Sequence, residues 1–270
     1  MFRIVLLVEY DGTNYYGWQS QKDNSLPTIQ QQLSIAISKV ANHQVSLVCA
    51  GRTDAKVHAV GQVLHFDTIS YRKIDSWIFG INSYLPRDIR VLSAQESLLE
   101  FNARKSALYR TYHYFIYNSK IRPGLFRNYV TWQYNNLDVD FMQQASNFWL
   151  GENDFSSFRG KGCQSKTAIR RVYEIKCTKQ QQIIKISITA NAFLKHMVRN
   201  MVGVLIKIGS AKDNRTILAK EILMAKNRTA AYITAPPEGL YLVSVGYPEQ
   251  FKIINNNEHG FASFLDLYNQ

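Results

Sequence analysis

A single carboxylate stands among basic residues in the stretch CAGRTDAKVHAVGQVLHF, residues 49–66. Asp54 lies in a predicted turn opened by Gly51, and no second acid occurs in this stretch. The basic residues around it are Arg52, Lys56, His58 and His65. An aspartate side chain is ionised at neutral pH, which is the form that a nucleophile or a general base requires. Aspartate in a turn also commonly hydrogen-bonds its own backbone. Spacing alone favours that structural role, so both interpretations stay open here.

The patterns that usually accompany other chemistries are missing from the sequence. It contains no G-x-x-x-x-G-K-[ST] phosphate loop, no H-E-x-x-H metal pair and no G-x-S-x-G nucleophile turn. The three cysteines, Cys49, Cys163 and Cys177, are far apart and form no C-x-x-C pair, which disfavours a disulfide framework or a thiolate zinc site. We therefore expect no metal site, and a protein of the reducing cytoplasm without a membrane segment.

The charge balance indicates a polyanionic partner. The 270-residue chain has 32 Lys and Arg against 20 Asp and Glu, a net charge of +12. Cationic side chains gain affinity for nucleic acid by displacing counterions from phosphates. The segment SSFRGKGCQSKTAIRR, residues 156–171, is rich in cations and has no acid. It is either a solvated surface loop or a loop that binds phosphates, and the overall charge favours the second interpretation.

The first hundred residues predict a β-α-β-β-α-β order of elements. Thr28 is placed to cap the first helix, with Gln31 at the capping-box position. Pro86 ends the second helix. The predicted elements are strand 2–10, a helix from Thr28 to about Val40, strands 45–50 and 61–68, helix 74–85 and strand 88–94. This is the split βαβ pattern.

The second half repeats that order. Its predicted elements are strand 109–117, helix 138–150, the hairpin 168–179 and 182–190, helices 193–208 and 215–226, and strand 240–247. We therefore predict an α+β fold: two ferredoxin-like (split βαβ, RRM-like) halves that form a broad, mainly antiparallel sheet with helices on one side and a central cleft. Two unrelated α+β units are the alternative.

The predicted domains are residues 1–100, which carry the Asp54 loop, residues 107–250, and a C-terminal tail, 251–270. The segment 97–106 is the predicted linker. In strand 109–117, alternation places Arg110, Tyr112, Tyr114 and Ile116 on one face. Aromatic side chains on a sheet can stack on single-stranded bases, but they are also favoured in strands for packing alone.

The motif GRTDAKVHA, residues 51–59, closely resembles the GRTDAGVHA signature of the TruA-type tRNA pseudouridine synthases. Four further segments resemble that family in order and spacing: EYDGTNYYGWQ (9–19), GENDFSSFR (151–159), NAFLKHMVRNMVG (191–203) and EGLYLVSVGYP (238–248). The resemblance covers roughly residues 3–248. It implies isomerisation of uridine to pseudouridine at positions 38, 39 and 40 of the tRNA anticodon stem-loop, without cofactor or metal, by a cytoplasmic homodimer.

The resemblance also implies roles for five residues. Asp54 matches the essential aspartate, whose attack on C1′, deprotonation at C2′ or addition at C6 the sequence does not separate. Arg52 matches the basic residue that helps to flip the nucleotide. Tyr112 matches the tyrosine that stacks on the target base, Arg199 the arginine that pairs with the aspartate, and Leu240 the apolar wall of the uracil pocket. A non-catalytic RNA-binding protein on this scaffold and a base-releasing glycosidase are the alternatives.

The sequence departs from the signature at Lys56, where the family has glycine. If that position requires a positive φ, lysine costs on the order of 1 kcal/mol there. The side chain would also add positive charge near Asp54. No catalytic group is lost by this change. We therefore expect lysine at position 56 to affect the geometry of the turn, and we still expect the activity.

Overall fold

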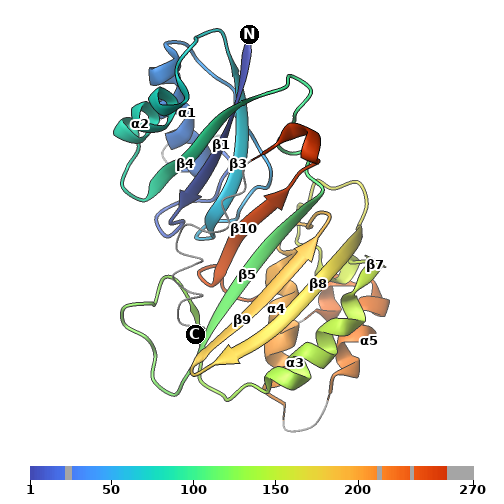
Figure 1. Ribbon diagram of the computed structural model, residues 1–270. Helices are drawn as coiled ribbons and strands as arrows, with labels where there is room; N and C mark the ends of the chain where they lie inside the picture. The colour runs from blue at the N-terminus through green and yellow to red at the C-terminus, as the bar shows by residue number, and fades with distance from the viewer. Residues whose placement is uncertain (22–25, 212–214, 232–233, 254–270) are drawn as a thin grey trace. The chain divides into compact units, whose positions relative to one another are not determined.

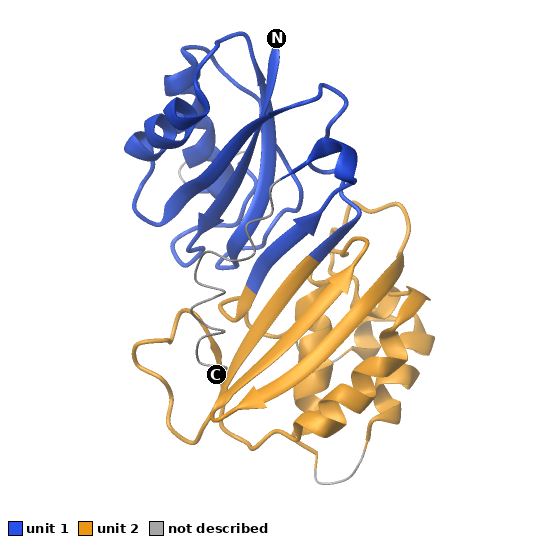
Figure 2. Cartoon of the chain, in the orientation of Figure 1, with its two compact units in different colours: residues 1–110, 241–270 blue, residues 111–240 orange. Residues whose placement is uncertain are grey.

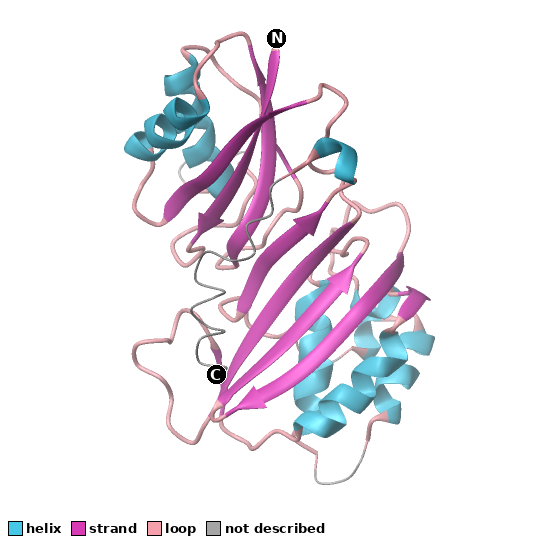
Figure 3. Cartoon of the chain, viewed as in Figure 1, coloured by secondary structure: helices cyan, strands magenta, loops and turns pink. Residues whose placement is uncertain are grey.

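The computed structural model describes residues 1–21, 26–211, 215–231 and 234–253, which fold into two compact units (Figure 2). Unit 1 comprises residues 1–110 together with 241–270, and unit 2 comprises residues 111–240. Both units combine helices with a mainly antiparallel sheet, so the protein is α+β as predicted (Figure 3). Apart from 251–253, the predicted C-terminal tail lies outside the described residues.

Unit 1 follows the predicted β-α-β-β-α-β order. Its elements are β1 (Phe2–Tyr10), α1 (Ile29–Ala41), β2 (Val48–Cys49), β3 (His58–Thr68), α2 (Ile74–Tyr84), β4 (Ile89–Ser97) and β10 (Leu240–Gly246), whose first residue is counted in unit 2. The strands lie in the order β4-β1-β3-β10, and β2 pairs with β3 (Figure 1). Strand β1 is antiparallel to β3 and β4, whereas β10 is parallel to β3.

Local sequence explains the start of α1. The Thr28 hydroxyl accepts a hydrogen bond from the backbone N–H of Gln31, as the capping position predicted. The apolar face buries Ile29, Leu33 and Ile37. The helix ends at Asn42, which has φ 58°, a left-handed conformation that asparagine tolerates better than most residues. The helix is therefore fixed at both ends by side-chain chemistry that the sequence displays.

Unit 2 contains the remaining elements. They are β5 (Tyr109–Asn118, its first two residues counted in unit 1), β6 (Thr131–Gln133), α3 (Val139–Ser146), β7 (Gly151–Asp154), β8 (Ile169–Gln180), β9 (Ile183–Ala190), α4 (Met197–Gly209) and α5 (Ile217–Ala225). The strand order is β5-β9-β8-β7, with β6 parallel to β5. Helices α3, α4 and α5 lie together on one face of this sheet (Figure 1). Short 3-10 helices cover Asn147–Trp149, Ser156–Phe158, Arg228–Ala230 and Glu249–Phe251.

Several boundaries differ from the prediction. Strand β2 has only two residues where six were predicted, and β3 begins at His58, three residues early, because His58 pairs with Tyr241 in the parallel ladder. Helix α4 begins at Met197 instead of residue 193, because His196 has φ 61° and cannot belong to a right-handed helix. The short strands β6 and β7 were not predicted. Within the described residues, no helix has the length and hydrophobicity to cross a bilayer.

Candidate active site

The Asp54 loop, residues 50–57, is fixed at its start by a buried glutamine. The loop joins β2 to β3. The Gln62 side chain, fully buried in β3, donates from Nε2 to the carbonyl oxygen of Gly51 at 2.6 Å and accepts from the Gly51 N–H at 3.4 Å. The backbone N–H of Ala50 donates to the Val63 carbonyl at 2.8 Å. The chain therefore leaves the sheet in a defined direction before it reaches Asp54.

The segment 11–18 frames the same loop on both sides of Asp54. The Trp18 N–H donates to the Thr53 carbonyl at 3.0 Å, and the Lys56 N–H donates to the Tyr15 carbonyl at 3.2 Å. The Thr53 hydroxyl lies 2.8 Å from the Tyr10 hydroxyl. These bonds involve the residue before Asp54 and the second residue after it, so the backbone around the carboxylate is held in place. The EYDGTNYYGWQ and GRTDAKVHA motifs thus form one structural unit.

Two glycines permit this close approach. A Cβ at Gly17, which has φ 89°, would lie 2.8 Å from the Thr53 carbonyl oxygen. A Cβ at Gly12 would lie 2.1 Å from the carbonyl oxygen of Val57. Any side chain at either position would push the segment 11–18 off the Asp54 loop. Glycine is therefore required here by contact between two backbones.

The turn itself contains a left-handed lysine. Lys56 has φ 63°, which satisfies the condition under which the departure from the glycine of the signature costs stability. The Val57 N–H closes the turn on the Asp54 carbonyl at 3.2 Å. Asp54 is half-buried, while Arg52 and Lys56 are exposed. Asp54 is thus partly accessible to solvent, with cations on both sides of it along the chain.

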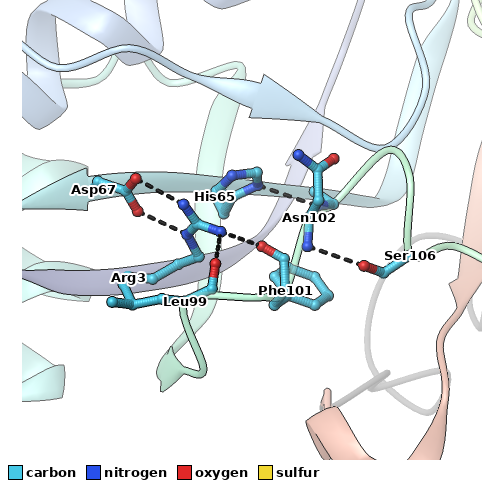
Figure 4. A network of polar contacts seen from close by, with 8 residues as sticks. Arg3, His65, Asp67, Leu99, Phe101, Asn102 and Ser106 are labelled. Carbon is cyan, nitrogen blue, oxygen red and sulfur yellow. Dashed lines mark hydrogen bonds and ion pairs between the residues drawn. The ribbon is translucent and has the colours of Figure 1, made fainter.

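The two histidines of residues 49–66 make contacts that stabilise the fold. His58 is buried, and its Nδ1 atom lies 3.1 Å from the Gly12 nitrogen and 3.2 Å from Asp11 Oδ1. Its ring stacks on Tyr241, with centroids 4.7 Å apart. The Nδ1 atom of His65 accepts from the Ala103 N–H at 3.1 Å, in the network that Figure 4 shows. Burial, aided by the charge of Arg3, lowers the pKa of His65 to about 4. It is therefore neutral at physiological pH.

Three of the predicted site residues belong to unit 2. Tyr112 is buried in β5 and meets Phe193 edge to face, with centroids 5.0 Å apart. Arg199, in the first turn of α4, donates from Nε to the Ala235 carbonyl at 2.8 Å. Leu240 is 5% exposed at the start of β10. Arg52 and Asp54 share the loop in unit 1.

The cation-rich segment 156–171 uses two of its arginines internally. Arg159 donates to the carbonyls of Cys163 and Ser165, and Arg170 donates to that of Thr167. Both side chains therefore order the loop itself. Lys161 and Lys166 are exposed and available to phosphate. The interpretation of this segment as a phosphate-binding loop stays a prediction that rests on these two lysines.

Sequence reasoning missed the residues that support the loop. Gln62 is the one amide side chain in the strand segment GQVLHF, between apolar residues, and that position could have indicated a buried hydrogen-bonding role. Tyr10 and Thr53 carry no such signal, because aromatic and hydroxyl residues are ordinary at strand ends and in turns. Across the described residues, no group of three His, Cys, Asp or Glu side chains is arranged to hold a metal ion. The three cysteines are free thiols.

Comparison with known proteins identifies the family. A family model described as tRNA pseudouridine synthase matches residues 6–104 and 145–248. A protein named tRNA pseudouridine synthase A from Legionella pneumophila (strain Lens) is 52% identical over 255 residues, which cover 94% of this chain and 96% of that protein. Another of that name, from Coxiella burnetii (strain Dugway 5J108-111), is 48% identical over 253 residues, with the same coverage. The chain belongs to the tRNA pseudouridine synthase family.

Proposed function

We propose that this tRNA pseudouridine synthase, an isomerase, modifies uridines 38, 39 and 40 of the tRNA anticodon stem-loop and that Asp54 is its nucleophile. The observation that carries the assignment of Asp54 is the frame around it. Backbone hydrogen bonds from Trp18 and Lys56 hold the loop on either side of the carboxylate. A reactive group gains rate from such fixed positioning, because the geometry of attack is set before the substrate arrives.

The reaction rearranges bonds within one nucleotide. The N1–C1′ glycosidic bond breaks, the uracil turns, and C5 bonds to C1′ while the proton on C5 leaves to solvent and N1 gains one. An ionised Asp54 supplies the electron pair for attack on the nucleotide, and the same carboxylate is regenerated when the new C–C bond forms. No electron or group is gained or lost overall, so the chemistry asks for no redox cofactor.

The other four residues are proposed to bind the uridine. A base within a stem must leave the helical stack before a side chain can reach its sugar, at a cost of a few kcal/mol. Arg52, exposed beside Asp54, is proposed to help to expel the nucleotide and to occupy its place. Tyr112 is proposed to stack on the base, and Leu240 to form an apolar wall. Arg199 is proposed to supply the guanidinium that favours the charged carboxylate.

The finer features of the fold and assembly belong to the same proposal. Two ferredoxin-like halves with a central cleft are proposed from the predicted order of elements, a cytoplasmic location from the cysteine usage, and a homodimer that binds tRNA from the family resemblance. The β4-β1-β3 order of unit 1, with β2 on β3, supports the ferredoxin-like description of that unit. The three free thiols agree with a reducing compartment.

Release of tritium from tRNA labelled at uridine C5 tests the activity and the role of Asp54 together. The wild-type protein should release tritium to water, and single replacement of U38, U39 or U40 by cytidine should remove the corresponding share. Asp54→Asn should abolish release while tRNA affinity is retained. Asp75→Asn, an exposed acid in the first turn of α2, is the matched control and should react as wild type.

The alternatives give different products in the same assay. A non-catalytic RNA-binding protein would bind tRNA and release nothing, even as wild type. A glycosidase would yield free labelled uracil in place of tritiated water. If Asp54→Asn released tritium at the wild-type rate, Asp54 would not be the nucleophile, although the family activity would still hold.

A further inference from the structure

The segment 11–18 is bound at two points to the turn between α2 and β4. Asp88 lies in this turn, immediately before β4, and is half-buried. Its backbone carbonyl accepts from the Asp11 N–H at 2.9 Å. Its carboxylate oxygen Oδ1 accepts from the Tyr15 hydroxyl at 2.7 Å. One residue of unit 1 therefore holds both the start and the middle of the segment that frames the Asp54 loop.

The turn that carries Asp88 is itself fixed. The Ile89 N–H donates to the Pro86 carbonyl at 3.2 Å, and Arg90 Nη1 donates to the same carbonyl at 2.6 Å. Ile89 is fully buried and pairs with Tyr10 in the ladder between β1 and β4. The backbone of Asp88 is therefore placed by the sheet and by its own turn.

Every polar group of Tyr15 is used in this frame. Its N–H donates to the Gly12 carbonyl at 3.0 Å, its carbonyl accepts from the Lys56 N–H at 3.2 Å, and its hydroxyl donates to Asp88. Burial and the bond to Asp88 raise the pKa of the Tyr15 phenol, so it remains a donor at neutral pH. A hydroxyl that donates to a carboxylate makes a stronger hydrogen bond than one between neutral groups. Tyr15 therefore links Asp88 to the backbone two residues after Asp54.

The start of the Asp54 loop is held by other groups. Arg110, 8% exposed, donates from Nη2 to the Ala50 carbonyl at 3.0 Å, next to the carbonyl that Gln62 holds. These bonds precede Asp54 in the chain, whereas the bond to Tyr15 follows it. Without the Tyr15 anchor, the backbone of the carboxylate would be held less firmly on its far side.

We propose that Asp88 is a positioning residue for the reaction and that it acts on Asp54 through Tyr15. The Asp88 carboxylate and the Tyr15 phenol hold the segment 11–18, and that segment holds the loop in which Asp54 lies. The rate of attack depends on this placement, because misplacement of a reacting group by about 1 Å can cost about a hundredfold in rate. The proposal rests on the proposed function, since it takes Asp54 as the nucleophile.

Single-turnover tritium release and tRNA affinity test the role of Asp88. Tyr15→Phe and Asp88→Ala should each lower the release rate about tenfold with Kd for tRNA unchanged, because each removes one hydrogen bond to a carboxylate. Asp88→Asn keeps an acceptor oxygen and should recover most of the rate. The double variant Tyr15→Phe/Asp88→Ala should be no slower than either single variant, because both remove the same bond. Tyr84→Phe, which changes an exposed tyrosine at the end of α2, is the matched control and should react as wild type.

Hydrogen exchange of the Lys56 N–H, followed by NMR on protein labelled at lysine, measures the same link without any reaction. Tyr15→Phe and Asp88→Ala should speed this exchange about tenfold, because the amide is less protected when the segment 11–18 loosens, whereas Tyr84→Phe should not. Release rates equal to that of Tyr84→Phe would overturn the positioning role, even in less stable variants, because the bond would then serve stability alone. A wild type that releases no tritium would overturn the proposed function, and faster Lys56 exchange in the variants would still support the link from Asp88 to the loop.

Discussion

The hydroxyl groups of Tyr10 and Thr53 lie 2.8 Å apart, and both residues are buried. Thr53 is the residue immediately before Asp54. The contact extends into a short chain of hydrogen bonds, because Gln62 Nε2 lies 3.4 Å from the Tyr10 hydroxyl and 2.6 Å from the Gly51 carbonyl. Strand β1, strand β3 and the loop are thereby linked through polar atoms in the interior. The direction in which the Asp54 loop leaves the sheet depends on these hydrogen bonds.

Tyr10→Phe should therefore slow catalysis without weakening tRNA binding. The variant keeps the ring but leaves the Thr53 hydroxyl without this partner, a loss of about 1 kcal/mol. If that loss falls on the transition state, kcat drops about fivefold. Single-turnover tritium release and tRNA affinity, measured on the same preparations, separate the two effects.

The threonine side of the contact supplies the control. Thr53→Ser keeps a hydroxyl and should stay close to wild type, whereas Thr53→Val should resemble Tyr10→Phe. The double variant Tyr10→Phe/Thr53→Val should lose less than the sum of the two single losses, because both remove one interaction. Strictly additive losses would contradict the positioning role.

Gly17→Ala should damage the loop more severely. The added Cβ would sit 2.8 Å from the Thr53 carbonyl oxygen, at a residue whose φ of 89° a side chain already disfavours. We expect a loss of stability of about 1–3 kcal/mol and a lower kcat, because the segment 11–18 must move away from the loop. Denaturant unfolding and single-turnover kinetics measure these effects.

Gly124→Ala is the matched control for this change. A Cβ at Gly124 has no heavy atom within 4 Å. The variant should therefore unfold and react as wild type does. A Gly17→Ala protein indistinguishable from Gly124→Ala would mean that the two backbones are not held as tightly as the structure indicates.

The sequence predicted the elements best where local chemistry decides them. Strand β1 and helix α1 have the expected bounds because an apolar run and the Thr28 cap specify them independently of the rest of the chain. Pairing between distant segments was not predictable in the same way. The early start of β3 depends on Tyr241, and the late start of α4 depends on the left-handed conformation of His196. Neither feature has a local signal.

The candidate site divides along the same line. Asp54 and Arg52 are predicted site residues because of an unusual composition and a motif, both of which are visible in the sequence. Gln62 and Arg110 act by reaching backbone carbonyls of residues many positions away, and a side chain's choice of carbonyl is set only by the tertiary fold. The motifs predicted which segments matter, and the structure adds how the segment 11–18 supports the Asp54 loop.

Lys56→Gly should stabilise the protein. The left-handed φ of 63° at Lys56 is strained because it brings the Cβ too close to the backbone. Glycine has no Cβ and removes that strain. Glycine loses more chain entropy on folding, which offsets part of the gain, so the net increase should be roughly 0.5–1 kcal/mol in the free energy of unfolding. Chemical denaturation of both proteins measures it.

A lysine with ordinary backbone geometry provides the comparison. Lys220, inside helix α5, has a right-handed helical backbone, so Lys220→Gly removes no strain and should destabilise by about 1 kcal/mol. The two substitutions are chemically identical and should have opposite signs. Destabilisation by both would show that the Lys56 side chain contributes more to the turn than its backbone costs.

The buried His65 should make stability fall as the solution is acidified. Its pKa in the folded protein is about 4, lowered by burial and by Arg3, against an ordinary value of 6.5. Between these two values the unfolded chain binds a proton at this residue and the folded chain does not, so each step toward lower pH favours unfolding. The loss begins as the pH falls below about 6.5, continues to about 4, and amounts to at most about 3 kcal/mol.

His65→Gln tests this contribution directly, because glutamine does not ionise and its amide oxygen can still accept from the Ala103 N–H. The variant should lose less stability than wild type between pH 6.5 and 4, and the two curves should run parallel at higher pH. The Arg3–Asp67 ion pair does not contribute to this difference between the two proteins. Because Arg3 lowers the pKa of Asp67, that pair weakens only at more acidic pH. Parallel curves across the whole range would mean that His65 accepts its proton in the folded state as readily as in the unfolded chain.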